Sequence, residues 1–163
     1  MYQARLFASR HARGYERFYY LVGPSVLFII KWLSRLSAGR LDGFVTWAES
    51  KAKGFLFDCK MCGNCVLSST GMACPMNCPK TIRNGPCGGV REDGNCEVDP
   101  QMKCVWVAAW EGSAHMKGGQ AIQDVQFAVD VSHQGTSAWL RMLKQREQNA
   151  ADLKQAKSVP PTQ

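Results

Sequence analysis

The sequence of 163 residues lacks the glycine-rich patterns that bind nucleotides. It contains neither Gly-x-Gly-x-x-Gly nor Gly-x-x-x-x-Gly-Lys-Ser/Thr, so neither a dinucleotide nor a nucleotide phosphate has a recognisable cradle. The chain is also too short for a (β/α)8 barrel, which typically needs about 250 residues. Without a site for a flavin or a nicotinamide, the chain is not expected to complete a redox reaction alone.

Catalytic side chains are equally scarce. The three histidines, at positions 11, 115 and 133, show no ligand spacing to one another or to the cysteines. No Ser/His/Asp arrangement, paired carboxylate or open metal site with a histidine base stands out. We therefore predict no catalytic residue in this chain and expect a non-catalytic subunit rather than an independent enzyme.

Acidic residues are few in the amino-terminal third. Residues 1–57 contain nine Lys/Arg and three Asp/Glu, and the whole chain has a net charge of +7. Such a basic arm is typical of contact with nucleic acid, an anionic membrane surface or an acidic protein. Nothing resembles a helix-turn-helix or a zinc finger with paired cysteines and histidines, so we expect no nucleic-acid partner.

Long hydrophobic runs are absent as well. The segment Phe18–Ile30 is uncharged for thirteen residues, which is shorter than the roughly 20 residues that span a bilayer. Within it, Gly23-Pro24 predicts a break, with Pro24 as the first residue of a new helix.

No clean secretory signal is visible, and a cytoplasmic protein is expected. We predict that residues 1–40 form a helical, apolar extension that packs on a partner or on the rest of the chain. Peripheral contact of residues 18–36 with the inner membrane face is the alternative.

What the sequence does have is a concentration of cysteine. All eight cysteines lie within one short segment, at positions Cys59, Cys62, Cys65, Cys74, Cys78, Cys87, Cys96 and Cys104. The first three have the spacing Cys-x-x-Cys-x-x-Cys, which in bacterial ferredoxins places three thiolates around one face of an iron–sulphur cube. Structural zinc sites more often use two separated Cys-x-x-Cys pairs, and the second pair is missing here.

The later cysteines favour the same chemistry. Cys74 and Cys78 each precede a proline, as does the last cysteine of the ferredoxin run, and Cys87 lies in the glycine-rich stretch Asn84–Gly89. Eight thiolates would satisfy two 4Fe–4S clusters. Zinc held by four thiolates and mixed occupancy remain open. A disulphide framework is the third alternative, and it requires an oxidising compartment.

The spacing of apolar residues predicts the remaining organisation. Residues 41–54 have helical spacing, with Gly54 as the C-terminal stop. The stretch 58–99 reads as loops folded around metal, residues 105–110 as a short helix or strand, and residues 137–146 as a helix. We thus predict a small, irregular, α-rich and metal-stabilised domain, whose Cys-rich loops surround iron–sulphur clusters and which carries an N-terminal helical extension. Its parts are the extension (1–40), the cluster-binding domain (41–112), a partner-docking segment (113–144) and a disordered tail (145–163).

The block from Gly54 to Trp110 resembles the methylenetetrahydrofolate reductase C-terminal domain family. The matching elements are Cys59-x-x-Cys62-Gly63-x-Cys65, Cys74-Pro75-x-x-Cys78-Pro79-Lys80, Arg83-Asn84-Gly85-Pro86-Cys87-Gly88-Gly89, Cys96-Glu97 and Cys104-Val105-Trp106. The resemblance implies a small subunit with two 4Fe–4S clusters that docks beside a flavin-containing methylenetetrahydrofolate reductase subunit. It would relay electrons between that flavin and a donor or acceptor protein, with all eight cysteines as candidate ligands. Which four cysteines share a cluster is not decided by spacing. A zinc-stabilised docking subunit of the same kind of complex is the alternative function.

Overall fold

The computed structural model describes residues 2–36 and 40–158 of the chain. Its α-helices are α1 (Tyr2–Arg10), α2 (Ala12–Leu36), α3 (Asp42–Phe57), α4 (Val105–His115) and α5 (Ala138–Ser158). Three short 3-10 turns join them, namely η1 (Pro75–Asn77), η2 (Gly119–Gln123) and η3 (Val131–His133). Strand pairing in these described ranges is limited to the isolated bridges Val90–Cys96 and Asn95–Lys103. The prediction of a small helix-rich fold is confirmed.

The two N-terminal helices meet at His11, and not at the predicted break. α2 continues through Pro24, so the expected new helix at that residue is wrong. Pro24 is on the exposed side of α2, where water can hydrogen-bond the carbonyl that a proline leaves without a donor. Ala8 of α1 and Ala12 of α2 are fully buried in a cluster with Phe57 and Met116. These small side chains let the two helices pack closely against the rest of the chain.

α3 leads the chain into the cysteine-rich loops. The predicted stop at Gly54 is three residues early, since the helix ends at Phe57 and Asp58 adopts a left-handed conformation with φ of 51°. The amide of Asp58 closes the last turn by donating to the carbonyl of Gly54, at 3.0 Å. Phe57 is buried in the same cluster as Cys74, so the end of α3 directs the chain toward the candidate site.

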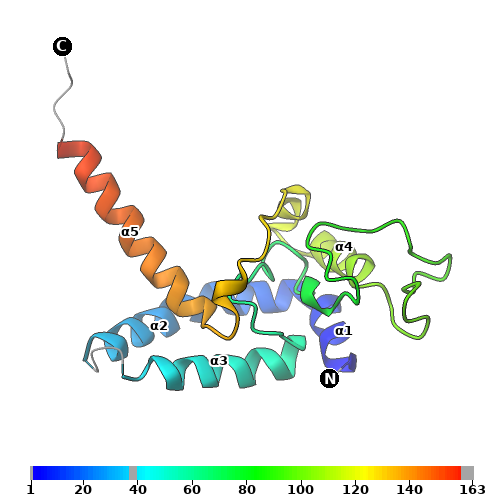
Figure 1. Cartoon of the computed structure of the whole chain (residues 1–163), viewed down its shortest axis with the longest axis horizontal. Coiled ribbons are helices and arrows are strands. Elements are labelled where there is room, and N and C mark those ends of the chain that lie inside the picture. Colours follow the sequence, from blue (N-terminus) through cyan, green and yellow to red (C-terminus); the bar gives the residue numbers. More distant parts are fainter. Residues whose placement is uncertain (1, 37–39, 159–163) are drawn as a thin grey trace, which may run out of the picture.

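Loops occupy the space between α3 and α4, as the sequence predicts. Between residues 58 and 104 the described chain has only η1 and the two isolated bridges as regular structure. Figure 1 shows these loops gathered around α4, while α2 and α3 extend to the opposite end of the molecule. α4 starts immediately after Cys104, and Trp106 in its first turn is buried.

The C-terminal part returns to the N-terminal helices. The helix predicted for residues 137–146 is present as the first half of α5, where Leu140 packs against Ile30 of α2 and Val45 of α3. α5 then remains helical to Ser158 and projects away from the other helices, whereas the sequence predicts a disordered tail from residue 145. Residues of high helix propensity explain this difference, since Lys, Gln, Glu, Ala and Leu predominate there. Residues 159–163 of that predicted tail lie outside the described residues.

Candidate metal centre

Four of the eight cysteines line one pocket beside the C-terminal end of α3. They are Cys59, Cys62, Cys65 and Cys74, which we call the first group. The empty space of the pocket, including its open mouth, is about 380 Å³. Cys62 and Cys74 are buried, whereas Cys65 is exposed. The pocket is therefore lined with thiols on its inner wall and reaches the surface at Cys65.

Left-handed backbone positions bend the loop that carries the first three cysteines. Asp58, Met61 and Gly63 have φ of 51°, 48° and 70°. The amide of Met61 donates to the Sγ atom of Cys59 at 3.3 Å. A Cβ atom on Gly63 would lie 2.4 Å from the carbonyl oxygen of His133, so only glycine fits at this position.

Cys59 and Cys74 interact directly. The hydrogen bond from the Cys74 thiol lowers the pKa of Cys59 to about 6, with further help from the Met61 amide. The same hydrogen bond, together with burial, raises the pKa of Cys74 far above its ordinary value. The hydrogen bond therefore favours the thiolate form of Cys59 and the thiol form of Cys74. Metal-binding thiols act as thiolates, and the hydrogen bonds to Cys59 favour that form.

A buried ion pair of α3 lies along the wall of this pocket. The Nζ atom of Lys53 is 2.5 Å from Oε1 of Glu49, and both side chains are buried. Glu49 also accepts a hydrogen bond from the hydroxyl of Ser137 at the start of α5. Burial lowers the pKa of Lys53, but the charges of Cys65 and Glu49 outweigh it and raise the pKa above its ordinary value. Lys53 is thus a permanent positive charge that favours thiolates in the pocket.

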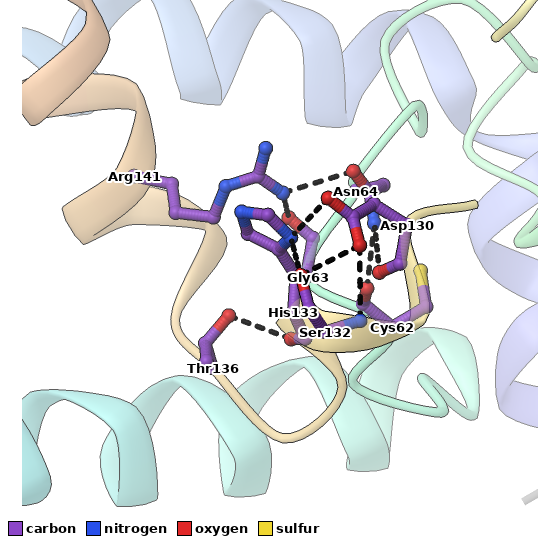
Figure 2. Close-up of polar contacts among 8 residues, drawn as sticks. All are labelled: Cys62, Gly63, Asn64, Asp130, Ser132, His133, Thr136 and Arg141. Carbon is purple, nitrogen blue, oxygen red and sulfur yellow. Dashed lines mark hydrogen bonds and ion pairs between the residues drawn. The ribbon is translucent and has the colours of Figure 1, made fainter. Parts of the chain in front are cut away.

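Residues 130–141, which include the first turn of α5, fasten the Cys59–Cys65 loop in place, as Figure 2 shows. The guanidinium of Arg141 donates to the carbonyl of Gly63 at 2.7 Å and to Oδ1 of Asn64 at 2.9 Å. The side-chain amide of Asn64 donates to the carbonyls of Cys62 and Asp130, at 2.8 and 3.3 Å. We call this set of contacts the clamp. It connects residues about seventy positions apart and fixes the backbone on which the first group depends.

Two further hydrogen bonds extend the clamp along the loop. The amide of Gly135 donates to the carbonyl of Met61 at 2.7 Å. The side-chain amide of Gln134 donates to the carbonyl of Lys60 at 2.8 Å. Most carbonyls of this irregular loop therefore have partners, although no sheet or helix supplies them.

Three other cysteines lie in a separate environment, on the side of the loops that faces α4. Cys96 and Cys104 are buried in an apolar cluster with Met102, Val105 and Trp106, and Cys78 packs against that cluster. We call these three, together with Cys87, the second group. Cys87 is exposed, and the bridge between Val90 and Cys96 holds its loop beside the cluster. Cys74 and Cys78 are thus four residues apart in the sequence and belong to different groups.

Trp106 positions the glycine-rich loop that carries Cys87. Its indole nitrogen donates to the carbonyl of Ile82 at 3.1 Å. A Cβ atom on Gly85 would lie 2.4 Å from the ring of Trp106, so the backbone passes directly over the indole. Lys80 and Glu97, which lie on either side of Cys87 in the sequence, form an ion pair across the loop.

Neither group is drawn together around a single point. In the described part of the chain, no three His, Cys, Asp or Glu side chains converge closely enough to hold one metal ion. A zinc ion with Zn–S bonds of about 2.3 Å needs its four sulphurs within about 4 Å of one another. In a cluster each thiolate binds a different iron atom, so the sulphurs lie farther apart. The first group lines a pocket whose arrangement matches neither spacing as it stands.

The sequence did not reveal the clamp or the buried ion pair. Arg141, Asp130 and Ser137 lie far from the cysteines in sequence, and no local pattern connects them to the Cys59–Cys65 loop. The i, i+4 spacing of Glu49 and Lys53 was a readable signal for an ion pair, but it did not indicate burial beside the cysteines. The three histidines take no part in either group, and the Nδ1 atom of His133 lies 2.9 Å from a carboxylate oxygen of Asp130.

These features define a class: small helix-rich proteins in which two groups of thiols are embedded in loops. The family model described as methylene-tetrahydrofolate reductase C terminal matches residues 39–132, which is more than half of the chain. The chain belongs to that family. No curated protein and no solved structure matches it.

Proposed function

We propose that this chain is an electron-transfer subunit that carries two 4Fe–4S clusters, one in each cysteine group, beside a flavin-containing methylenetetrahydrofolate reductase subunit. The observation that carries the proposal is the set of four thiols that line one pocket in a chain of this family. The bound groups would accept and donate single electrons.

In the first group, Cys59, Cys62, Cys65 and Cys74 would be the ligands. Lys53 would offset part of the negative charge of four thiolates, and the clamp would hold the loop that presents three of them. In the second group, Cys78, Cys87, Cys96 and Cys104 would be the ligands, surrounded by Trp106 and its apolar neighbours. Exposed Cys65 and exposed Cys87 mark the points where each site approaches the surface, and short distances to a partner favour electron transfer there.

The same thiols support one alternative. Four thiolates can hold zinc instead, in which case the chain would be a structural docking subunit of the same complex. The hydrogen bond between Cys59 and Cys74 favours this alternative, because two of the sulphurs already lie together. The alternative predicts a colourless protein without redox response.

The experiment measures iron, acid-labile sulphide and zinc in anaerobically purified full-length protein, with an EPR spectrum after dithionite reduction. We expect about eight iron and eight sulphide per chain and a signal from reduced clusters. Purification from a strain that also expresses a tagged flavin-containing reductase subunit should recover the two proteins together. Stoichiometric zinc without sulphide would refute the electron-transfer function and leave the docking function.

A further inference from the structure

One side of α2 is apolar and is not covered by any described part of the chain. Phe18, Leu21, Phe28, Ile29 and Trp32 are each between 52 and 79 % exposed. Since successive residues of an α-helix advance by about 100°, these five side chains fall within an arc of about 100°. We call them the α2 stripe. Leu27 and Ile30 on the opposite side are buried, so α2 has one apolar face for its own fold and a second one that faces solvent.

The carboxylates of the first 57 residues are withdrawn from the surface around this stripe, whereas exposed Glu147 of α5 lies at its border. Glu16 is 4 % exposed and accepts hydrogen bonds from the amides of Lys117 and Gly118, at 2.8 and 3.0 Å. Glu49 is buried with Lys53, and half-buried Asp42 accepts a hydrogen bond from Ser34 at 3.0 Å. These are the three acidic residues of positions 1–57. Over residues 2–36 and 40–57, the charged side chains that are exposed are all basic, namely Arg10, Arg13, Arg17, Arg35, Arg40 and Lys51.

The basic residues of α2 lie along one border of the stripe. Arg13, Arg17 and Arg35 fall within about 40° of one another and next to Phe28 on the helical wheel. Arg35 and Lys31 also contact Glu147 of α5, at 3.5 and 2.9 Å, so Arg13 and Arg17 are the better test of free positive charge. The stripe extends about 21 Å, fourteen residues at 1.5 Å each. Its border is basic at the N-terminal end, while Glu147 offsets part of the positive charge at the other end.

We propose that α2 is an interfacial helix through which the chain binds the surface of an anionic phospholipid bilayer. An exposed stripe of Phe, Leu, Ile and Trp beside a row of arginines is the pattern of helices that lie in the plane of the interface. The aromatic rings would enter the headgroup region, and the guanidinium groups would contact lipid phosphates. Within the described ranges, no helix is long and apolar enough to cross a membrane.

The charges favour lipid over a protein as the occupant of this face. Protein interfaces surround an apolar centre with a polar rim, whereas the surface of an anionic bilayer presents charge of one sign. Here the exposed charges of α1, α2 and α3 have one sign, and Ser25 is the polar residue within the arc of the stripe. This inference goes beyond electron transfer, because it assigns a location to the carrier through residues that neither cysteine group uses.

The test is co-sedimentation of the full-length, metal-loaded protein with vesicles. We compare vesicles of phosphatidylcholine alone with vesicles that also contain about 30 % phosphatidylglycerol. The bound fraction should correspond to at least a tenfold higher partition coefficient with the anionic lipid, and it should fall as salt rises from about 0.05 to about 0.5 M. The double variant Phe28→Ser/Trp32→Ser should lower the partition coefficient at least tenfold. The control Phe127→Ser removes a side chain that is 93 % exposed in a loop and should bind as the unsubstituted chain does.

A second variant keeps the test decisive if the aromatic substitutions impair folding. Arg13→Gln/Arg17→Gln changes exposed side chains only and should reduce binding to anionic vesicles about tenfold, with unchanged helical circular dichroism and iron content. Equal affinity for both vesicle types, or unchanged binding by both double variants, would overturn the proposal. It would also be overturned if the stripe variants abolished association with a reductase subunit or with a second copy of the chain while vesicle binding was absent throughout. That result would assign the stripe to a protein interface.

Discussion

The two cysteine groups are held by contacts of different kinds. The first group depends on hydrogen bonds and buried charge: the clamp on the Cys59–Cys65 loop and the Glu49–Lys53 pair behind the pocket. The second group depends on apolar packing, with Cys96 and Cys104 buried beside Trp106 and with Cys87 left exposed. Charge beside thiolates stabilises them electrostatically, whereas an apolar surrounding raises the cost of their charge. Two groups of thiols can thus acquire different properties within one small domain.

The two loops that carry these groups also differ in the contacts that hold their folded conformation. Sequence-distant hydrogen bonds secure the Cys59–Cys65 loop. In the stretch from Lys80 to Gly94, Arg83 and Asn84 make such bonds to Asn64, Gln126 and Phe127, but residues 86–88 and 91–93 are exposed. The second loop should therefore owe more of its order to a bound metal group.

Metal removal should produce the largest effect, an increase in the rate of proteolysis. This increase should be larger in the loop of the second group than in the loop of the first. When the full-length protein is treated with an anaerobic iron chelator, we expect trypsin to cleave after Arg91 at least tenfold faster. Cleavage after Lys60 in the clamped loop should rise much less. Both side chains are exposed, so each serves as the control for the other in one digest followed by mass spectrometry. Equal acceleration at the two sites would contradict the contrast between the loops.

Gly63→Ala should damage the first group severely. The substitution combines a positive φ with a Cβ atom placed 2.4 Å from a backbone oxygen, and we expect a loss of about 3 kcal/mol in the free energy of unfolding. Gly88→Ala is the matched control, because Gly88 has φ of 78° but no atom within 4 Å of the added Cβ. Its cost should be about 1 kcal/mol, from the left-handed conformation alone. Denaturant unfolding of both variants measures the difference, and equal costs would show that the clamp is not in close contact at Gly63.

Lys53→Met should destabilise the protein by about 3 kcal/mol, because it leaves the buried carboxylate of Glu49 without its ion-pair partner. The double variant Glu49→Gln/Lys53→Met should regain most of that loss, since it buries no unpaired charge. Lys60→Met, at an exposed pair with Asp58, should change stability by less than about 0.5 kcal/mol. If the double variant is as unstable as Lys53→Met, the pair does not act as a unit.

Alkylation of the metal-free protein should show the smallest effect, a shift in one pH profile. The lowered pKa of Cys59, about 6, means that its thiolate is present above pH 6 and is lost as the pH falls through that value. The rate of reaction with iodoacetamide at Cys59 should therefore be half-maximal near pH 6 and nearly constant above pH 7. Cys74, whose pKa is raised, should react little over this range. A rate at Cys59 that still rises between pH 8 and 9, as for an ordinary thiol with a pKa of about 8.5, would contradict the shared-proton pair.

The sequence predicted the features that depend on local spacing. Helical periodicity located α3 and the start of α5, and the density of Gly, Pro, Asn and Cys correctly indicated loops between residues 58 and 99. Local rules also misjudged two helices. Gly23-Pro24 did not break α2, because the exposed side of a long helix tolerates a proline, and α5 continued past residue 145 on helix propensity alone.

The assignment of the eight cysteines to two groups could not be predicted from their spacing in the sequence. Cys74 and Cys78 share the repeated Cys-Pro pattern, yet η1 between them turns the chain so that they face different groups. The contacts that secure the first group come from residues 130–141, which carry no cysteine and no motif linked to metal binding. Such long-range contacts are set by the packing of α5 on α2 and α3, which spacing does not encode.

The central claim, that the eight thiols form two separate sites, is tested most directly by four single variants. Cys62→Ser, Cys74→Ser, Cys78→Ser and Cys104→Ser would be purified anaerobically, and iron, sulphide and the reduced EPR spectrum measured. Each should lose about half of the iron. Cys74→Ser should lose the same EPR component as Cys62→Ser, and Cys78→Ser the same component as Cys104→Ser. If Cys74→Ser and Cys78→Ser instead lose the same component, the division into two groups is wrong.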